Sequence, residues 1–513
     1  MNNKLLKQIF VTILLSLFSI SIFIIVSWIK NYAGPYWLGS NSDPEYAYLF
    51  NSLNFVHWLP VGHFDHPGTP LQMMGACVLI IVRLTRGGHG LVNDVLSNPE
   101  LYLNAINFFL ISILFLTILF GGFLVYRLTK KIFLGIIFQM TPFLSTTSIW
   151  TFNRISPELL LLITGMWFAL IIFYFYYKKK ENSLLAVICL SLITGFSIAT
   201  KINSLPLILL GLVFFTFRNK ILYILGTVIS FVLFTWPIHN NYKIFYNWII
   251  RLITHSGMYG SGDEKFIDIA IFGKNFMQVV YSEGFLIITI IIIFVYLIFL
   301  FREKNKINYY SSLVGVLLFF LSQIFIVSKH LSIHYLVPAL SFLGITYVIF
   351  GTILLKQKNR FSKILIPIIF ASLIIVSINN VWKIYDSTRG YQQNYIEAKD
   401  IESFKNKNYK ESFIVYYYRS SSKEYALYFG NIYSGNAYTD LLNEMYSRSY
   451  FYDIWRKTFS RWNWWNKLVN LPSNKTIIFQ GTPFKNSYLQ FAPDFTLQDI
   501  YNGNTETLYL FIK

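Results

Sequence analysis

Charged residues and cysteines are both scarce in this chain. Of its 513 residues, 13% are Asp, Glu, Lys or Arg and 55% are hydrophobic, a balance far too apolar for a soluble protein of this length. Cys77 and Cys189 are the only cysteines and have no partner nearby in the sequence. They argue against a disulfide framework and against a thiolate metal site. No long repeat period is visible, which argues against a repeat architecture.

Long apolar runs are what the chain has instead. Residues 9–29 and 285–301 approach or reach the roughly 20 apolar residues that a helix needs to cross the hydrocarbon core of a bilayer. The first run is too long for the apolar region of a signal peptide, and no small-residue cleavage site follows it. We therefore expect a retained first span and a multispanning, all-α membrane protein.

Apolar segments of suitable length predict about eleven transmembrane helices. They are expected at residues 5–29, 104–127, 132–150, 157–177, 183–200, 204–217, 221–237, 284–301, 308–328, 335–355 and 363–380. The net charge of +19 could indicate a nucleic-acid partner, but the Lys and Arg clusters fall on alternate connections between these spans. Such connections face the cytoplasm under the positive-inside rule, so no nucleic-acid partner is expected and the N-terminus is predicted to be cytoplasmic.

This topology predicts a transmembrane domain over residues 1–380 and an extracytoplasmic domain over 381–513. Two outer loops, 30–103 and 238–283, are expected to carry interfacial helices at 71–84 and 244–255, because these segments have an apolar helical face but are short or interrupted. Glycines at positions 257, 260 and 262 suggest a mobile hinge after the interfacial helix at 244–255. Strand-like runs at 413–418, 476–481 and 507–513, with helical patterns at 420–430 and 440–469, predict a small α/β domain.

The first outer loop concentrates acids and histidines. Asp43 precedes a proline and an apolar i, i+3, i+4, i+7 pattern, so it is a candidate helix N-cap as well as a candidate base. Glu45 falls in the first turn, where the helix dipole stabilises a carboxylate without any further function. His63, Asp65 and His66 could suggest zinc, but the second pair of ligands that would make a strong zinc motif is missing.

Further polar residues lie near the predicted outer ends of the spans. This set includes Arg154, Glu158, Lys201, Lys329 and His334. Each of them alone is explained by a snorkelling side chain or a helix cap. Together they predict an outer cavity that holds cations and acids, against the inward bias of basic residues.

Several segments resemble motifs of the GT-C superfamily of membrane glycosyltransferases, in particular the branch of protein O-mannosyltransferases and aminoarabinose transferases. SDPEYAYLF resembles the acidic motif of its first outer loop, and HPGTPLQMMGACVLIIVRL is similar to its His-Pro-Pro-Leu segment. NRISPELLLL and IATKINSLPLILL resemble later segments that carry an acid and a Thr-Lys pair, and KHLSIHYLVPAL is a weaker match near the last spans. The chain departs from the pattern at His-Pro-Gly-Thr-Pro and in the separation of the two acids.

The resemblance implies an enzyme that moves a sugar from a polyprenyl-phosphate carrier to an acceptor hydroxyl or amine on the outer side of the membrane, with inversion. It implies Asp43 as the general base. It implies Arg154, Lys201 and Lys329 around the donor phosphate, and Glu45, His66, Glu158, His334 and Tyr335 as contacts to the substrates. No metal is expected to be required, although a divalent ion is possible in such enzymes.

Two other functions stay open at this point. A polysaccharide polymerase or ligase shares the chemistry and the lipid carrier. A transporter or flippase of a lipid-linked sugar is disfavoured because no two related halves are visible. We assume a bacterial source and expect a multi-pass protein of the cytoplasmic membrane, with a glycan, a lipid or a protein as acceptor.

Overall fold

The computed structural model describes residues 3–64, 67–87, 90–302, 310–357, 360–454, 456–463, 471–472, 475–488 and 496–512. Contacts divide the chain into two compact units. The first unit consists of Met1–Val26, Phe64–Leu71 and Phe108–Ile384, and the second of Ser27–His63, Gln72–Asn107 and Tyr385–Lys513. The predicted domain boundary at residue 380 stays a prediction, because each unit is assembled from three separate segments.

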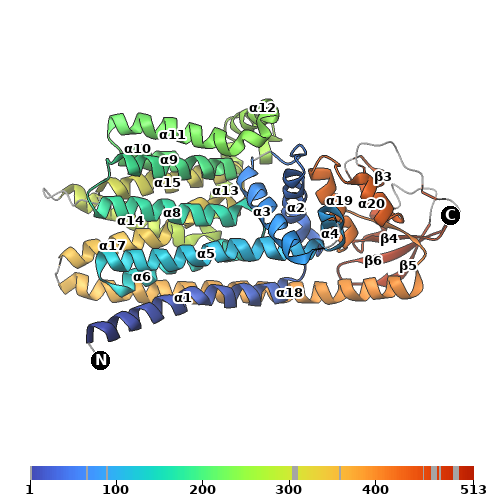
Figure 1. The fold of residues 1–513 in the computed structure, drawn as a ribbon, viewed down its shortest axis with the longest axis horizontal. Coiled ribbons are helices and arrows are strands. Elements are labelled where there is room, and N and C mark those ends of the chain that lie inside the picture. The colour runs from blue at the N-terminus through green and yellow to red at the C-terminus, as the bar shows by residue number, and fades with distance from the viewer. Residues whose placement is uncertain are drawn as a thin grey trace. The chain divides into compact units, whose positions relative to one another are not determined.

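The first unit is built from packed helices (Figure 1). They are α6 (Ile132–Gln139), α7 (Thr146–Trp150), α8 (Pro157–Tyr177), α9 (Leu184–Thr200), α10 (Leu207–Phe214), α11 (Phe217–Thr235), α12 (Tyr242–Thr254), α13 (Ile269–Ser282), α14 (Gly284–Arg302), α15 (Tyr310–Lys329), α16 (Val337–Leu340) and α17 (Leu343–Gln357), with parts of α1 (Asn3–Ala33), α3 (Thr69–Arg86), α5 (Pro99–Thr129) and α18 (Arg360–Asn408). Helix α9 packs between α8 and α11, while α15 packs on α10, α13 and α14.

Seven helices among the described residues are long and apolar enough to cross a membrane, or nine if each of two bent pairs is one span. The protein is therefore a multi-pass membrane protein, and the predicted mostly helical fold is confirmed. The predicted number of eleven spans is not confirmed. The segment predicted as one span at 132–150 is broken into α6, a 3-10 turn with Pro142 and α7, because proline lacks the N–H that a continuous helix needs.

The second outer loop contains more structure than its sequence predicted. Helix α12 occupies the expected place, but α13 was missed. It begins at Ile269, and its N-cap is Asp268, whose side chain accepts hydrogen bonds from the backbone N–H groups of Ala270 and Ile271. Between the two helices the chain folds back on itself through a bridge of His255 with Glu264.

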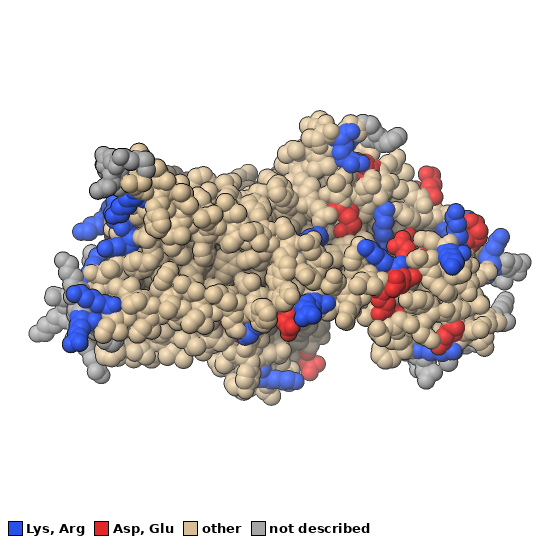
Figure 2. Space-filling model, turned by 90° about the horizontal axis from the view of Figure 1, so that it is seen from below, with Lys and Arg blue, Asp and Glu red and all other residues tan. Residues whose placement is uncertain are grey.

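Basic residues mark one end of the helical unit. The connections α5–α6, α8–α9, α10–α11 and α17–α18 carry or adjoin Lys and Arg clusters such as 127–131, 178–180 and 218–220. Figure 2 shows Lys and Arg gathered at this end, followed by a broad surface almost free of charge. Such an uncharged band is what a surface in contact with lipid requires.

The second unit contains a six-stranded sheet of order β3-β2-β1-β4-β6-β5. Its elements are η1 (Gly39–Asn41), α2 (Ser42–Val56), α4 (Leu91–Ser97), β1 (Phe413–Tyr416), α19 (Lys423–Tyr433), α20 (Thr439–Met445), β2 (Ser449–Asp453), β3 (Thr458–Ser460), β4 (Ile477–Gly481), α21 (Lys485–Tyr488), β5 (Thr496–Asn502) and β6 (Thr507–Ile512). Strand β1 lies parallel to both of its neighbours, β2 and β4. The predicted α/β character of this region is confirmed.

One prediction for this region was wrong, and one helix is longer than the span predicted within it. Among the described residues of the segment 440–469, α20 is helical and the chain then forms β2 and β3, because the aromatic run Tyr450 to Tyr452 favours a strand. The last span, predicted to end near residue 380, continues as α18 to Asn408. Its polar final turns pack Ile401 on Ile478 and Leu508 of the sheet, and this tertiary contact extends the helix beyond its apolar part.

Candidate functional site

Glu158 and Lys201 form a buried ion pair in the first unit. Glu158 is the second residue of α8 and Lys201 directly follows the last residue of α9. A carboxylate at a helix N-terminus and an ammonium group at a helix C-terminus each complement the dipole of their own helix. Lys201 Nζ lies 2.5 Å from Glu158 Oε1, and the two residues are only 5% and 4% exposed.

Three more predicted residues surround this pair. The Lys201 ammonium group lies over the ring of Tyr335, 4.2 Å from its centroid. His334 Nε2 lies 3.7 Å from the same Glu158 oxygen, and the charge of Arg154 acts on the His334 imidazole. The Lys201 ammonium group and the His334 imidazole thus converge on one carboxylate, and the half-exposed imidazole connects the buried pair to the surface.

Gln323 fixes the backbone around this cluster, and the sequence did not single it out. Its side-chain amide donates to the carbonyl oxygens of Asn203, at 3.1 Å, and Tyr335, at 2.6 Å. Asn203 donates to the same Tyr335 carbonyl, at 2.9 Å. An amide inside the apolar run of α15 is costly unless it is hydrogen-bonded. The presence of Gln323 in this apolar run was the signal by which the sequence could have identified it.

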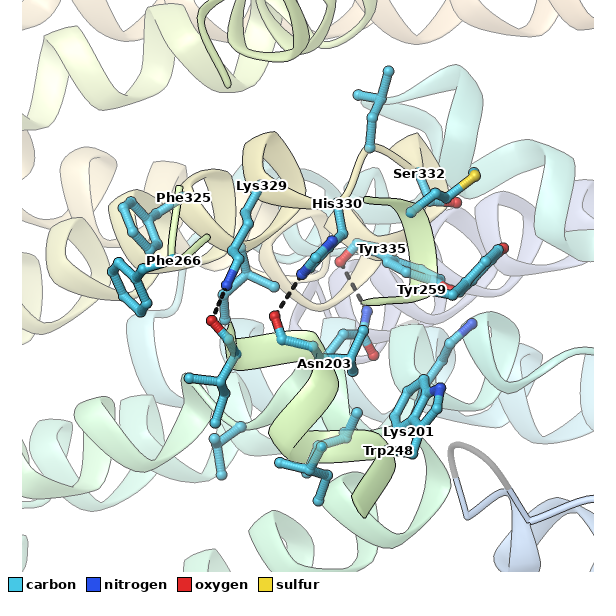
Figure 3. Close-up of a pocket in the computed structure, with 18 residues that line it drawn as sticks. Lys201, Asn203, Trp248, Tyr259, Phe266, Phe325, Lys329, His330, Ser332 and Tyr335 are labelled. Carbon is cyan, nitrogen blue, oxygen red and sulfur yellow. Dashed lines mark hydrogen bonds between the residues drawn. The ribbon is translucent and has the colours of Figure 1, made fainter. Parts of the chain in front are cut away.

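A cavity of about 300 Å³ is lined in part by Lys201 of the ion pair. Figure 3 shows the residues that line it. Most of its lining is apolar, from α12, α15 and the turn between α12 and α13. The lining residues are Lys201, Ile202, Asn203, Leu205, Trp248, Ile249, Leu252, Ile253, Met258, Tyr259, Phe266, Phe325, Ile326, Lys329, His330, Leu331, Ser332 and Tyr335. The walls suit an apolar chain, and the two lysines supply positive charge.

Lys329 and His330 attach the end of α15 to α12. The Lys329 ammonium group donates to the carbonyl oxygen of Ile253 and lies over the ring of Phe266. His330 Nε2 lies 2.6 Å from the Leu252 carbonyl oxygen, so this nitrogen carries the hydrogen. Burial lowers the pKa of His330, which leaves the imidazole neutral at pH 7. Lys201 and Lys329 therefore provide the positive charge of the cavity.

Asp43 and Glu45 belong to the second unit. Asp43 is exposed and has extended backbone (φ −106°, ψ 116°) in front of the helical part of α2, the conformation that an N-cap adopts. Glu45 is fully buried in the first turn, so a role in contact with substrate would require its carboxylate to be uncovered. His66 and Asp65 lie outside the described residues.

The structure thus brings Arg154, Glu158, Lys201, His334 and Tyr335 into one cluster and places Lys329 at the adjoining cavity. Among the described residues, no group of three or more His, Cys, Asp and Glu side chains could hold a metal ion. Independence from metal stays a prediction, which activity in the presence of a chelator would test.

Comparisons with known proteins identify the fold. No family model and no curated protein matches the sequence. Two crystal structures of ArnT from Cupriavidus metallidurans match in three dimensions. The one bound to undecaprenyl phosphate has a TM-score of 0.53 and 11% identity, and the apo form has 0.52 and 12%. Each match covers 96% of this chain and 97% of ArnT. This chain therefore has the GT-C fold of ArnT.

Proposed function

We propose that the protein is a membrane glycosyltransferase that takes a sugar from a polyprenyl-phosphate-linked donor. The observation that carries the proposal is the cavity beside the Glu158–Lys201 pair, which joins apolar walls to two ammonium groups. The resemblance of the fold to ArnT, which has been crystallised with undecaprenyl phosphate, supports the same assignment. A polyprenyl phosphate needs both kinds of surface, because its tail is apolar and its head group is anionic.

The two lysines suit the leaving group of such a reaction. Each ammonium group has three hydrogen-bond donors. Lys201 uses one on Glu158 and Lys329 uses one on the Ile253 carbonyl oxygen. The remaining donors are available to phosphate oxygens, and charge stabilisation inside an apolar cavity is stronger than in water. Arg154, close to the His334 imidazole, adds a further cation to this end of the unit.

The transfer itself requires a base for the acceptor. In the proposed reaction the acceptor oxygen attacks the anomeric carbon from the face opposite the phosphate, its proton goes to Asp43, and the bond from the anomeric carbon to the phosphate oxygen breaks. The product is the inverted glycoside, and the carrier leaves as the polyprenyl phosphate. Asp43 is exposed, as a base that meets an external acceptor must be. Glu158, His334, Tyr335, Glu45 and His66 remain proposed substrate contacts.

The orientation of the protein follows from its charges. The basic connections are proposed to face the cytoplasm. Helix α8 runs from Glu158 to the 178–180 cluster over 21 residues, about 30 Å at 1.5 Å per residue, which matches the thickness of a bilayer core. The site then opens on the outer side.

Transfer in detergent tests the function directly. The purified protein is mixed with a set of polyprenyl-phosphate sugars labelled in the sugar, together with a cell-envelope extract as acceptor source. Label that moves from the lipid to an acceptor without a sealed membrane supports the transferase. Movement of lipid-linked sugar only across sealed vesicles would identify a transporter. Products that carry many added sugars on one acceptor would identify the polymerase.

A further inference from the structure

The second unit contains a cavity of its own, of about 180 Å³. It lies among the final turns of α18, strand β1, the start of α19 and the segment after α1. The lining residues are Trp37, Glu402, Lys405, Asn406, Tyr409, Lys410, Ile414, Tyr416, Ser421, Ser422, Lys423 and Glu424. Neither the sequence motifs nor the proposed transfer reaction uses this cavity.

The cavity extends along β1, from Tyr409 and Lys410 before the strand to Ser421 in the loop after its carboxyl end, and this second end is where parallel α/β sheets bind ligands. Strand β1 ends at Tyr416, and its two parallel neighbours are reached by connections that lead to opposite sides, β2 on one side and β4 on the other. The carboxyl ends of strands at such a switch point leave a crevice that commonly serves as a binding site. Ser421 and Ser422, which line the cavity, directly precede α19.

The side chains that support the cavity are held in place by hydrogen bonds. Glu506 accepts from the backbone N–H of Ser421 and from the side-chain amide of Gln480, both at 2.5 Å. Lys405 is buried and donates to the other side-chain atom of Gln480, Oε1, at 2.7 Å. This chain of bonds ties α18, β4 and the loop after β1 together, so the cavity is preorganised.

Its charges are mixed rather than of one sign. Two carboxyl side chains, Glu402 and Glu424, line the cavity together with three lysines, Lys405, Lys410 and Lys423. A phosphate or carboxylate would meet these acids, and a cation would meet the lysines. Sugar hydroxyl groups both donate and accept hydrogen bonds, so a neutral sugar satisfies such an interleaved set.

Aromatic side chains complete this environment. Trp37 is half-buried, and Tyr409 and Tyr416 line the same space. Aromatic rings combine large apolar faces with a polar edge, which suits the C–H face of a sugar ring. We propose that this cavity binds one neutral sugar unit of a glycan.

The place of Trp37 in the chain suggests what that glycan does. Trp37 precedes Asp43 by six residues, so the two Cα atoms are at most about 20 Å apart. A glycan anchored at the cavity could therefore extend by a few sugars to Asp43. The assignment of the bound sugar to the acceptor rests on the proposed function, whereas sugar binding does not.

Saturation-transfer NMR on the full-length protein in detergent tests the proposal. The probes are the methyl glycosides of glucose, galactose, mannose and N-acetylglucosamine, with inorganic phosphate as the anionic probe. Two variants remove a contact at the cavity: Trp37→Leu and Glu402→Gln. The matched control is Lys407→Gln, an exposed residue of the same helix that does not line the cavity.

We expect at least one glycoside to bind with millimolar affinity, about tenfold weaker in each cavity variant and unchanged in Lys407→Gln. Three results would overturn the proposal: lack of binding by every glycoside, binding by both cavity variants as tight as that by the unmodified protein, or displacement of the sugar by phosphate. Because the measurement involves no turnover, sugar binding by a protein that transfers no sugar would contradict the proposed function and still support this site.

Discussion

At the scale of single residues, the buried pair of Glu158 and Lys201 dominates the first unit. Taking a carboxylate and an ammonium group out of water is costly, and their mutual attraction offsets this cost only while both are present. The pair therefore combines two roles. It stabilises the ends of α8 and α9, and it holds an ammonium group next to a cavity that suits an apolar chain.

Removal of one partner is predicted to destabilise the protein. Lys201→Met leaves the Glu158 carboxylate buried with its strongest partner gone, which costs about 3–5 kcal/mol. The double variant with Glu158→Gln removes the stranded charge and recovers part of that loss. Unfolding in mixed micelles measures both variants, with Lys274→Met, an exposed lysine of α13, as the matched control. Equal stability of Lys201→Met and the control would show that the pair contributes nothing.

At the scale of elements, the turn between α12 and α13 shapes the cavity. Met258 and Tyr259 of this turn line it. Gly260 has φ +74°, and a Cβ atom there would meet the carbonyl carbon of Arg251 at 2.9 Å. Glycine is the residue that tolerates both conditions. The predicted hinge at positions 257, 260 and 262 thus coincides with a tightly folded turn; its mobility stays a prediction.

Gly260→Ala is predicted to destabilise this turn by about 1–3 kcal/mol, because the added methyl group meets backbone atoms in a strained conformation. Binding of undecaprenyl phosphate, followed by native mass spectrometry, should weaken as well. Gly273→Ala in α13 is the matched control, since nothing lies within 4 Å of its Cβ position and alanine favours helix. If the two variants bind lipid equally, the turn does not shape the donor cavity.

Sequence patterns predicted the helices and strands that are determined by the residues of the segment itself. Long apolar runs predicted α5, α8 and α15, and strand-like runs rich in β-branched and aromatic residues predicted β1, β4 and β6. The failures have tertiary causes. The final turns of α18 are too polar to be predicted from hydropathy, and contacts of Ile401 with the sheet hold them.

In the candidate site, too, the sequence predicted residues in recognisable motifs and missed a residue whose role depends on tertiary contacts. Motif resemblance selected Glu158, Lys201, His334 and Tyr335, and the structure groups them. Gln323 was missed because its role depends on two backbone carbonyl groups that are brought to it by other segments. No sequence spacing encodes such a contact.

At the scale of the whole molecule, charge is distributed along the helices of the first unit. Glu158 and Lys201 lie at one end of α8 and α9, and the clusters at 178–180 and 218–220 lie beyond the other ends. The distribution fits a protein that works on one side of a membrane and is oriented by its positive charges.

Cysteine labelling tests this orientation. In a protein with Cys77 and Cys189 replaced by serine, one cysteine is introduced either at Ser261, in the turn beside the cavity, or at Lys178, both exposed positions. A membrane-impermeant maleimide is added to cells whose outer envelope lets it pass but whose cytoplasmic membrane is intact. It should label Ser261→Cys and leave Lys178→Cys unlabelled until the cytoplasmic membrane is disrupted. The reverse pattern would place the site in the cytoplasm.

The central claim is a sugar transfer with Asp43 as its base. The most direct test compares Asp43→Asn with Asp440→Asn, an exposed aspartate of α20, in the detergent transfer assay with undecaprenyl-phosphate binding measured in parallel. We predict that Asp43→Asn lowers the transfer rate by about 10²–10⁴-fold, the usual contribution of a general base, while lipid binding and folding are kept and Asp440→Asn transfers normally. A transfer rate in Asp43→Asn close to that of the unmodified protein would contradict the account.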